Sequence, residues 1–256
     1  MDSCRTTGKL PVSSVATAFR KNSSVLTNAQ IHRKALYSVR IDIESFFPSI
    51  KVNDLLRITR EAQTLQTEQW TESDIGQLLA QACFDRDGRL PIGYPTSPDI
   101  ANAVMYKIDT MLIDEISDRE RYGVANLTRY ADDFVFSTDK IGACASFLAH
   151  MQKMLATTFS PQLKINHKKT NFMSRKGGST LITGLRITNQ EAVTVHANYR
   201  DHVRLLLKLY QQGKLRTHEQ NSLAGHLAYI EHVAPSLFTK LAFRYHSEIR
   251  SLRVPA

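Results

Sequence analysis

The sequence lacks several features that would assign a chain to a class of protein at once. No apolar run approaches the roughly 20 residues that a membrane helix needs, and the N-terminus has no signal-peptide core. The three cysteines are far apart and show no CxxC spacing, which argues against a disulfide framework and against a zinc site. No internal repeat or low-complexity linker is found. The 256 residues therefore predict a globular, cytoplasmic protein with one large domain or two lobes.

Acidic residues are also scarce in parts of the chain. From Ser160 to Gln190 there are six Lys and Arg and no Asp or Glu, and from Tyr199 to the end nine Lys and Arg stand against four Asp and Glu. These stretches carry the chain's net charge of +9. Such asymmetry is typical of a surface that binds a polyanion. On charge alone, an ordinary solvated basic surface is an equal alternative.

Two adjacent carboxylates, Asp132 and Asp133, stand between apolar residues. The flanking residues predict a strand-turn-strand with both aspartates at the tip of the hairpin. Neighbouring ionised carboxylates repel each other, and a divalent ion such as Mg²⁺ relieves that repulsion because it prefers carboxylate oxygens. A bare Asp-Asp pair is more often an exposed turn, so the assignment depends on the rest of the chain.

Hydrophobic periodicity predicts an α+β protein. Alternation over 36–43 predicts a strand that ends at Asp42, and residues 1–34 show no strong period. Ser97 as N-cap with Pro98 at the first helical position predicts a helix start. Further elements are expected as helices over 51–65, 73–82, 141–158 and 199–211, a strand within 163–173, and a strand or hairpin over 181–188.

Three carboxylates are expected to come together in the folded chain. Asp42 ends a strand, and Asp132 and Asp133 lie on a hairpin 90 residues later, with helices between. This is the arrangement by which a palm-type polymerase brings three carboxylates together for two metal ions.

At this point the sequence resembles the reverse transcriptases, and among them the retron type of bacterial enzyme. The resemblance to reverse transcriptases is carried by four segments: Asp42–Ile50, Gly93–Pro98 with Ala101-Asn102, Tyr130–Asp133, and Asn166 with Lys169-Thr170. Asn28–His32 and Ile182–Gly184 resemble retron-specific segments, and Gly225–Tyr229 with Pro235 resembles the family's thumb. The likeness spans about residues 10 to 245.

The resemblance implies a right-hand polymerase palm, an antiparallel sheet backed by helices, with a C-terminal helical thumb. Its domains would be 1–35 (partial fingers and retron-specific insertion), 36–190 (fingers and palm) and 191–256 (helical thumb). The family usually has more residues ahead of the retron-specific insertion, so we expect reduced or truncated fingers.

The resemblance also assigns roles. Asp42, Asp132 and Asp133 would bind two Mg²⁺ ions, with Mn²⁺ as a substitute, and Lys169 would donate a proton to the leaving pyrophosphate, with Lys164 and Lys168 as alternatives. Phe47 would exclude the ribose 2′-OH. The remaining nucleotide-binding residues would be Ile43, Gly93, Pro95, Thr96 and Ser97. The RNA-binding residues would be Asn28, His32, Lys168, Thr183, Gly184, Arg186, Arg200, Arg204 and Lys208.

The resulting hypothesis is an RNA-directed DNA polymerase that copies a structured noncoding RNA into single-stranded DNA (msDNA). Its partners would be that RNA, the RNA–DNA product, deoxynucleoside triphosphates and an effector protein used in anti-phage defence, with no membrane partner. Two alternatives stay open. One is a catalytically weak RNA-binding scaffold that restrains an effector, and the other is an abortive-infection polymerase that makes untemplated DNA.

Overall fold

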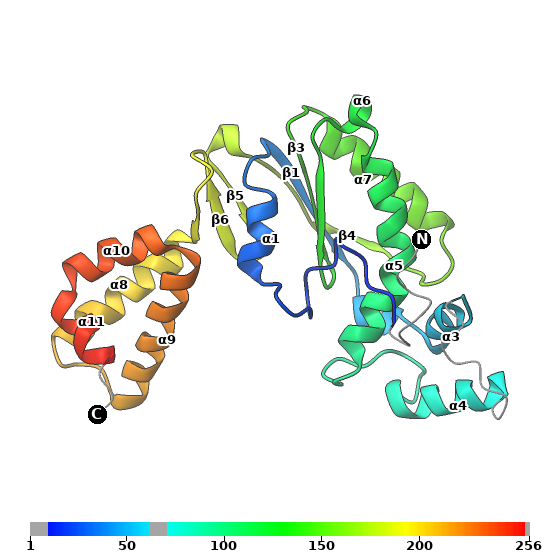
Figure 1. Ribbon diagram of the computed structural model, residues 1–256, viewed down its shortest axis with the longest axis horizontal. Helices are drawn as coiled ribbons and strands as arrows, with labels where there is room; N and C mark the ends of the chain where they lie inside the picture. Colours follow the sequence, from blue (N-terminus) through cyan, green and yellow to red (C-terminus); the bar gives the residue numbers. More distant parts are fainter. Residues whose placement is uncertain (1–9, 62–70, 254–256) are drawn as a thin grey trace. The chain divides into compact units, whose positions relative to one another are not determined.

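The computed structural model describes residues 10–61 and 71–253 (Figure 1). The chain forms two compact units: an N-terminal unit of residues 1–24 and 34–174, and a C-terminal unit of residues 25–33 and 175–256. A short early segment, residues 25–33, therefore belongs with the last third of the chain. The division into fingers, palm and thumb expected at residues 35 and 190 stays a prediction.

The N-terminal unit is α+β, as the sequence predicts. Its four strands are β1 (Tyr37–Ile43), β2 (Asn126–Tyr130), β3 (Asp133–Thr138) and β4 (Ile165–Ser174). Its helices are α2 (Phe46–Ser49), α3 (Val52–Glu61), α4 (Glu72–Cys83), α5 (Ser97–Ile116), α6 (Arg119–Tyr122) and α7 (Ala143–Thr157). The strands form one sheet in the order β2-β3-β1-β4, and every neighbouring pair is antiparallel.

Side-chain alternation along β1 separates the core from the functional face. Val39, Ile41 and Ile43 are buried in the main hydrophobic core. Arg40 and Asp42 lie on the opposite face, because successive residues of a strand point to opposite sides. Helix α7 packs against β1 and β3, and α5 lies against β2 (Figure 1). Helices thus cover one face of the sheet, and the polar residues of β1 are on the other.

The C-terminal unit combines a small sheet with helices. Its elements are α1 (Val25–Ile31), a 3₁₀ turn at Arg175–Gly177, the antiparallel strands β5 (Ser179–Ile182), β6 (Leu185–Thr188) and β7 (Val193–Val195), and the helices α8 (Ala197–Gln211), α9 (Thr217–Val233), α10 (Pro235–Arg244) and α11 (His246–Arg253). Helix α1 packs on β6 and β7, while α9 contacts β7, α8, α10 and α11.

Several predicted elements are confirmed, with three differences. The strand at 36–43 and the helices at 73–82, 141–158 and 199–211 match β1, α4, α7 and α8. The helix expected at 51–65 is α3, and residues 62–65 lie outside the described ones. The first difference is α1, which the sequence did not predict because its buried residues are Asn28 and Ala29 rather than an apolar stripe.

The other two differences concern the start of α5 and the length of β4. Ser97 is not the N-cap: Thr96 holds that position, and the Ser97 hydroxyl instead donates to the carbonyl oxygen of Pro91 at 2.6 Å. The strand expected within 163–173 is β4, and it is longer than the sequence suggests. Residues of the basic run 167–170 bulge out of the ladder, and pairing with β1 resumes beyond them and continues to Ser174.

Among the described residues, none of the helices combines the length and the apolar character needed to cross a bilayer. Cys83 and Cys144 are free thiols, and Cys4 lies outside the described residues.

Candidate active site

Strand pairing brings Asp42 and Asp133 together. They are direct partners in the antiparallel register of β1 and β3. Directly opposed residues of such a pair have Cβ atoms roughly 4.5–5.5 Å apart, so the two carboxylates lie on the same face of the sheet. Asp42 is buried and Asp133 is partly buried.

Asp132 occupies the turn that joins β2 and β3. Ala131 before it has a φ of 56°, a left-handed conformation that non-glycine residues adopt uncommonly. The carbonyl oxygen of Asp132 accepts a hydrogen bond from the Ile43 N–H at 3.1 Å, which joins the turn to the end of β1. The predicted hairpin is confirmed, with Asp132 in the turn and Asp133 as the first residue of β3.

Burial and like charge act together on Asp132. Burial raises the pKa of its carboxyl, and the neighbouring charges of Asp133 and Asp42 raise it further, while Lys169 lowers it. The β1–β3 register and the bond from the Ile43 N–H to the Asp132 carbonyl bring the three aspartates into one cluster of like charge.

Two cations balance this cluster. The Arg40 guanidinium binds both oxygens of Asp133, with Nε 3.0 Å from Oδ1 and Nη2 2.6 Å from Oδ2. The hydrogen bonds to Asp133, together with the charges of Asp133, Asp42 and Asp132, raise the pKa of Arg40 above its usual value. Lys169 Nζ lies 3.4 Å from Asp42 Oδ2. The sequence did not point to Arg40; the signal was its position two residues before Asp42, on the same face of the strand.

A bulge in β4 places Lys169 next to Asp42. Asp42 pairs with Asn166, whereas Arg40, two residues earlier, pairs with Asn171. Three extra residues therefore leave the ladder, and the Thr170 hydroxyl donates to the Asn166 carbonyl oxygen at 3.0 Å within the bulge. Bulges next to active sites re-aim side chains, and here Lys168 and Lys169 are exposed while Lys169 reaches Asp42.

The aspartates fit a divalent cation by their donor chemistry. Their oxygens are the hard, anionic ligands that Mg²⁺ prefers. The pKa of Asp132 is raised mainly by burial and to a lesser degree by the charges of Asp133 and Asp42, and a bound cation would offset both effects. Among residues 10–61 and 71–253, no group of three or more His, Cys, Asp or Glu side chains is already spaced as a metal cluster. In this arrangement Asp133 is paired with Arg40 and Asp42 with Lys169.

Phe47 lies on the short helix α2 that follows β1. Its ring is half-buried and packs edge-to-face on Phe46 (5.3 Å between centroids) and on Phe19 (6.4 Å). Phe46 is in the core, and Ser45 turns the chain with a φ of 47°. Phe47 is thus held five residues after Asp42 by packing on two other rings.

The predicted nucleotide-binding loop begins beside this helix. Leu90 N–H donates to the Ile50 carbonyl oxygen at 3.0 Å, so the loop starts next to the end of α2. Gly93, Pro95 and Thr96 are exposed, whereas Ser97 is buried and bonded to Pro91. Ser97 therefore braces the loop from inside. The side chain of Ile43 belongs to the core, and its N–H already bonds to Asp132.

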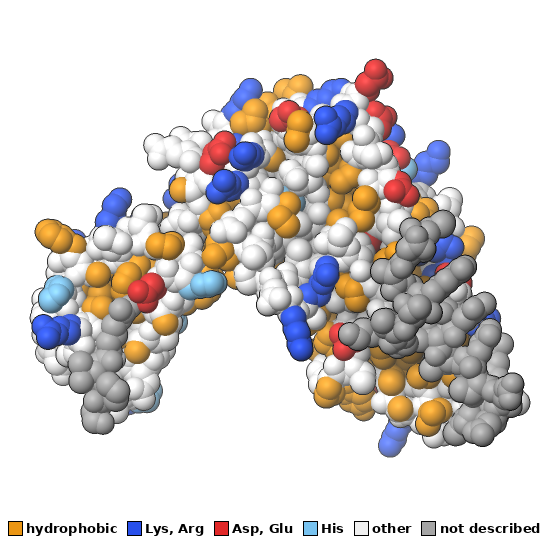
Figure 2. Space-filling model, in the orientation of Figure 1, with side chains coloured by type: hydrophobic (Ala, Val, Ile, Leu, Met, Phe, Trp, Pro, Cys, Tyr) orange, Lys and Arg blue, Asp and Glu red, His pale blue; other side chains and the backbone are white. Residues whose placement is uncertain are grey.

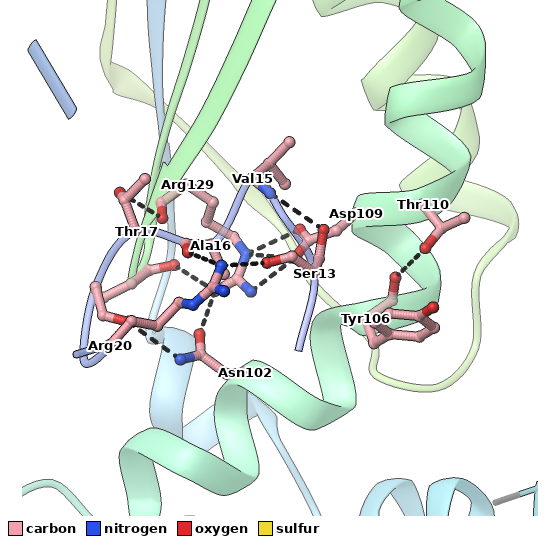
Figure 3. Close-up of polar contacts among 12 residues, drawn as sticks. Ser13, Val15, Ala16, Thr17, Arg20, Asn102, Tyr106, Asp109, Thr110 and Arg129 are labelled. Carbon is pink, nitrogen blue, oxygen red and sulfur yellow. Dashed lines mark hydrogen bonds and ion pairs between the residues drawn. The ribbon is translucent and has the colours of Figure 1, made fainter. Parts of the chain in front are cut away.

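A buried ion pair lies next to the turn that carries Asp132, and Figure 3 shows its contacts. Arg129 on β2 and Asp109 on α5 are both completely buried, and their guanidinium and carboxylate form hydrogen bonds of 2.8 and 2.7 Å. Arg129 also donates to Asn102 Oδ1 at 3.2 Å and to the carbonyl oxygen of Ala131 at 3.3 Å. The last contact holds the left-handed residue directly before Asp132.

The N-terminal segment completes this support. The Arg129 N–H donates to the Val15 carbonyl oxygen at 2.7 Å, and the Thr17 N–H donates to the Arg129 carbonyl oxygen at 2.8 Å. Asn102 donates to the Ala18 carbonyl oxygen at 3.2 Å. Sequence reasoning placed no role on Arg129 or Asp109, because an ion pair between residues 20 apart has no local pattern.

Three of the predicted RNA-binding residues, Asn28, Thr183 and Gly184, meet at the β5–β6 turn of the C-terminal unit. Thr183 and Gly184 make the β5–β6 turn, both with positive φ as in the commonest two-residue hairpin turns. Asn28 on α1 donates to the Thr183 hydroxyl at 3.4 Å, and that hydroxyl donates to the Val25 carbonyl oxygen at 3.2 Å. Asn28 and His32 are both buried, and of the two it is Asn28 that contacts the turn through the Thr183 hydroxyl.

The predicted RNA-binding cations are placed as follows. Arg186 on β6 donates to Ser179 at 2.8 Å, and Arg200 and Arg204 on α8 both bond to Asp201. Lys208 is exposed on the same helix, whose buried side is Val203 and Leu207. Lys168 belongs to the N-terminal unit.

Comparison with known proteins agrees with this geometry. The family model for reverse transcriptase (RNA-dependent DNA polymerase) matches residues 6–214. The retron Ec73 reverse transcriptase of Escherichia coli is 37% identical over 245 residues, covering 94% of this chain and 77% of that protein. The retron Ec83 reverse transcriptase of the same organism is 28% identical over 247 residues, covering 93% and 76%.

A solved structure, apo telomerase from Candida tropicalis truncated from the C-terminal domain, shares the fold with a TM-score of 0.52 at 13% identity. The match covers 71% of this chain and 41% of that one, so this chain spans less than half of the telomerase chain.

The chain belongs to the reverse transcriptase family and is an RNA-directed DNA polymerase. Within that family it is of the retron type. Reverse transcriptases generally use divalent metal ions, and the three aspartates are the residues here whose chemistry fits them.

Proposed function

We propose that this chain copies a structured noncoding RNA into single-stranded DNA (msDNA) by two-metal nucleotidyl transfer at Asp42, Asp132 and Asp133. The single observation that carries the proposal is the register of β1 and β3, which sets Asp42 opposite Asp133 with Asp132 in the adjoining turn. Two-metal catalysis needs carboxylates close enough to share metal ions, and this pairing brings together carboxylates that are far apart in the sequence. The substrates would be deoxynucleoside triphosphates and the 3′ or 2′ hydroxyl of a primer.

The residues of this chain would act in three ways. The aspartates would hold two Mg²⁺ ions, or Mn²⁺ in their place, and such ions supply activation of the attacking hydroxyl and charge stabilisation on the triphosphate. Lys169, exposed and 3.4 Å from Asp42, would protonate the leaving pyrophosphate. Phe47, fixed between Phe46 and Phe19, would exclude a ribose 2′-OH by its bulk.

The loop that holds Gly93, Pro95 and Thr96 would line the incoming nucleotide, braced by Ser97 from inside. Its exposed backbone, with Gly93 at a φ of 92°, leaves room for a base pair to approach.

The RNA would be recognised in part by the C-terminal unit. By sequence this unit has thirteen Lys and Arg against five Asp and Glu, so it carries +8 of the chain's net +9. Lys and Arg attract the phosphates of nucleic acid, and Arg186, Arg200, Arg204 and Lys208 are the candidates here. Asn28 would act indirectly by holding the Thr183–Gly184 turn, and His32, which is also buried, is the remaining candidate on this early segment. Lys168 would contact RNA from the β4 bulge of the other unit.

We also propose that the enzyme acts in the cytoplasm in anti-phage defence beside an effector protein encoded at the same locus. This part rests on the resemblance to retron systems.

The experiment is primer extension on a defined RNA template, with oligo(dT) on poly(rA) and thymidine triphosphate. Wild type should extend the primer with Mg²⁺ or Mn²⁺ and stop when the ions are chelated. Asp42→Asn should abolish extension, while Lys153→Ala, an exposed α7 lysine, should retain it. Extension by Asp42→Asn at the wild-type rate would contradict the assignment. Phe47→Val should add ribonucleotides more readily than wild type does.

A further inference from the structure

The C-terminal unit contains a pocket that the proposed chemistry does not use. It has a volume of about 310 Å³ and is lined by Gly184, Val195, His196, Tyr199 and Tyr229. The lining comes from the β5–β6 turn, the end of β7, the start of α8 and the middle of α9. On the face drawn in Figure 2, hydrophobic and histidine side chains are visible over the helices of this unit. Pockets of this size hold small organic groups.

The aromatic rings of the pocket are fixed in place. Tyr199 lies edge-to-face with Tyr229, with 5.7 Å between centroids, and with His226, with 5.4 Å. The Tyr199 hydroxyl and His226 Nδ1 are 2.8 Å apart. Tyr229 nevertheless stays 37% exposed, so much of its side chain is accessible from outside. Because the Tyr229 ring is already held in one orientation, little conformational entropy is lost when a flat ligand stacks on it.

The lining selects for a neutral ligand. None of the five lining residues is Lys, Arg, Asp or Glu, so nothing there neutralises a phosphate. Burial raises the pKa values of both tyrosines and lowers that of His226, which keeps these groups uncharged near neutral pH. His196 Nδ1 accepts a hydrogen bond from the Asn198 N–H, which leaves Nε2 as the ring nitrogen that can donate to a ligand.

Gly184 lines one side of the pocket with main-chain atoms and no side chain. Gly184 has a φ of 81°, and a Cβ built on it would meet no atom within 4 Å. A ligand can therefore approach the main chain of the β5–β6 turn closely. Because the pocket is uncharged while the unit around it carries +8, the unit can attract a polyanion by charge and take up a neutral part of it here.

We propose that this pocket binds an unpaired nucleobase of single-stranded RNA, stacked on Tyr229. Bases that are splayed out of single strands commonly stack on aromatic side chains and present their edges to nearby donors and acceptors. The inference deepens the proposed function, because it names single-stranded RNA as the form that the C-terminal unit recognises, and it rests on RNA being the partner.

The test uses the full-length protein and an oligouridine RNA of about 12 nucleotides with one central 2-aminopurine. Binding by wild type should quench the 2-aminopurine fluorescence, since stacking on tyrosine does so, and the same strand annealed to its complement should show no such quenching. Tyr229→Leu should weaken binding of the single strand roughly tenfold, which lies within the effect of removing one stacking ring.

Two control variants isolate the ring. Tyr229→Phe keeps the aromatic face and should bind the RNA like wild type. Phe243→Ala removes an aromatic that is 91% exposed in the same unit but does not line the pocket, and it too should bind normally. Circular dichroism spectra would verify that each variant is folded. Unchanged affinity and quenching in folded Tyr229→Leu would overturn the proposal.

A second measurement needs no variant. An oligouridine RNA with a central 4-thiouridine, irradiated with wild type, should crosslink to peptides that contain Tyr199 or Tyr229, and crosslinks confined to other peptides would overturn the proposal. Primer extension on poly(rA) tests the polymerase function separately. Wild type that extends the primer but places no base in the pocket would contradict this inference alone, whereas wild type that fails to extend would contradict the proposed function.

Discussion

At the scale of single residues, two of the proposed metal-binding aspartates lie beside cations of the same sheet. Arg40 binds Asp133 through two hydrogen bonds, and Lys169 lies beside Asp42. Ionised carboxylates at such close quarters repel each other, so these cations stabilise the aspartate cluster as the structure presents it. Once Asp42 is identified, strand alternation predicts that Arg40 lies on the same face of β1. That Arg40 binds Asp133 can be seen only from the pairing of β1 with β3.

The Lys169 amine gives the first residue-scale prediction. If Lys169 protonates the leaving pyrophosphate, Lys169→Ala should lower the rate of nucleotide addition by about 10²–10⁴-fold, as loss of one general acid does. Lys169→Arg should restore little, because a guanidinium does not give up its proton at working pH. Single-turnover extension measures this rate. Lys153→Ala is the control, and a loss of less than about threefold in Lys169→Ala would contradict a general-acid role.

His32 gives a prediction for pH. Burial lowers the pKa of His32 to about 3, whereas the unfolded chain should have a histidine pKa near 6.5. Below pH 6.5 the unfolded state therefore binds a proton that the folded state does not, and the free energy of unfolding falls by up to about 1.4 kcal/mol per pH unit as the pH drops from about 6.5 toward 3. Above pH 6.5 His32 contributes no slope.

Urea unfolding at pH 7.5, 6.5 and 5.0 measures that slope. His32→Gln should flatten the acid-side loss relative to wild type, because it removes the titrating group. His218→Gln, on an exposed position of α9, should keep the wild-type slope. Equal slopes in wild type and His32→Gln would show that His32 is not buried in its neutral form.

At the scale of elements, the Arg129–Asp109 pair joins β2 to α5, and the segment around residues 15–18 joins both (Figure 3). Because each partner is completely buried, removal of one leaves the other charge without its counter-ion in a site that water does not reach. The turn that carries Asp132 depends on the same guanidinium through the Ala131 carbonyl.

We therefore expect Asp109→Asn to lower the free energy of unfolding by about 3–5 kcal/mol. Arg89→Ala, which removes an exposed pair with Asp87, should change it by less than about 1 kcal/mol. Urea denaturation of both variants measures the difference. A cost below about 1 kcal/mol for Asp109→Asn would mean that Arg129 finds another partner.

The elements differ in how well the sequence predicts them. β1, α7 and α8 were predicted because each has one apolar face that repeats at the period of a strand or a helix. Helix α1 was missed, since its buried side consists of Asn28 and Ala29 and its burial is decided by packing on β6 and β7. The β4 bulge was missed for a related reason: only the pairing with β1 shows that residues leave the ladder.

At the scale of the whole molecule, charge and chemistry are divided between the two units. The three aspartates belong to the N-terminal unit, while nearly all of the net positive charge belongs to the C-terminal unit. The sequence located this charge in the C-terminal third but could not show that residues 25–33 fold with it, because contacts between segments about 150 residues apart leave no local pattern.

The sequence predicted the motif residues of the candidate site but not the residues that support them. The ordered motifs single out the three aspartates and Lys169 as candidates, and the fold brings these candidates together, with Asp42 opposite Asp133 and near Lys169. Arg40, Arg129 and Asp109 were not found, because each acts through a partner that only the folded chain brings near. Supporting residues of this kind carry no motif of their own.

The most direct test of the central claim is the nucleic acid that co-purifies with the protein expressed from its native locus. It would be separated on a denaturing gel with and without RNase and DNase, beside the Asp132→Asn/Asp133→Asn double variant. Templated DNA synthesis at these aspartates predicts a discrete, DNase-sensitive band with wild type that is missing from the variant. RNA alone in both lanes would contradict the claim and leave a protein that holds RNA without copying it.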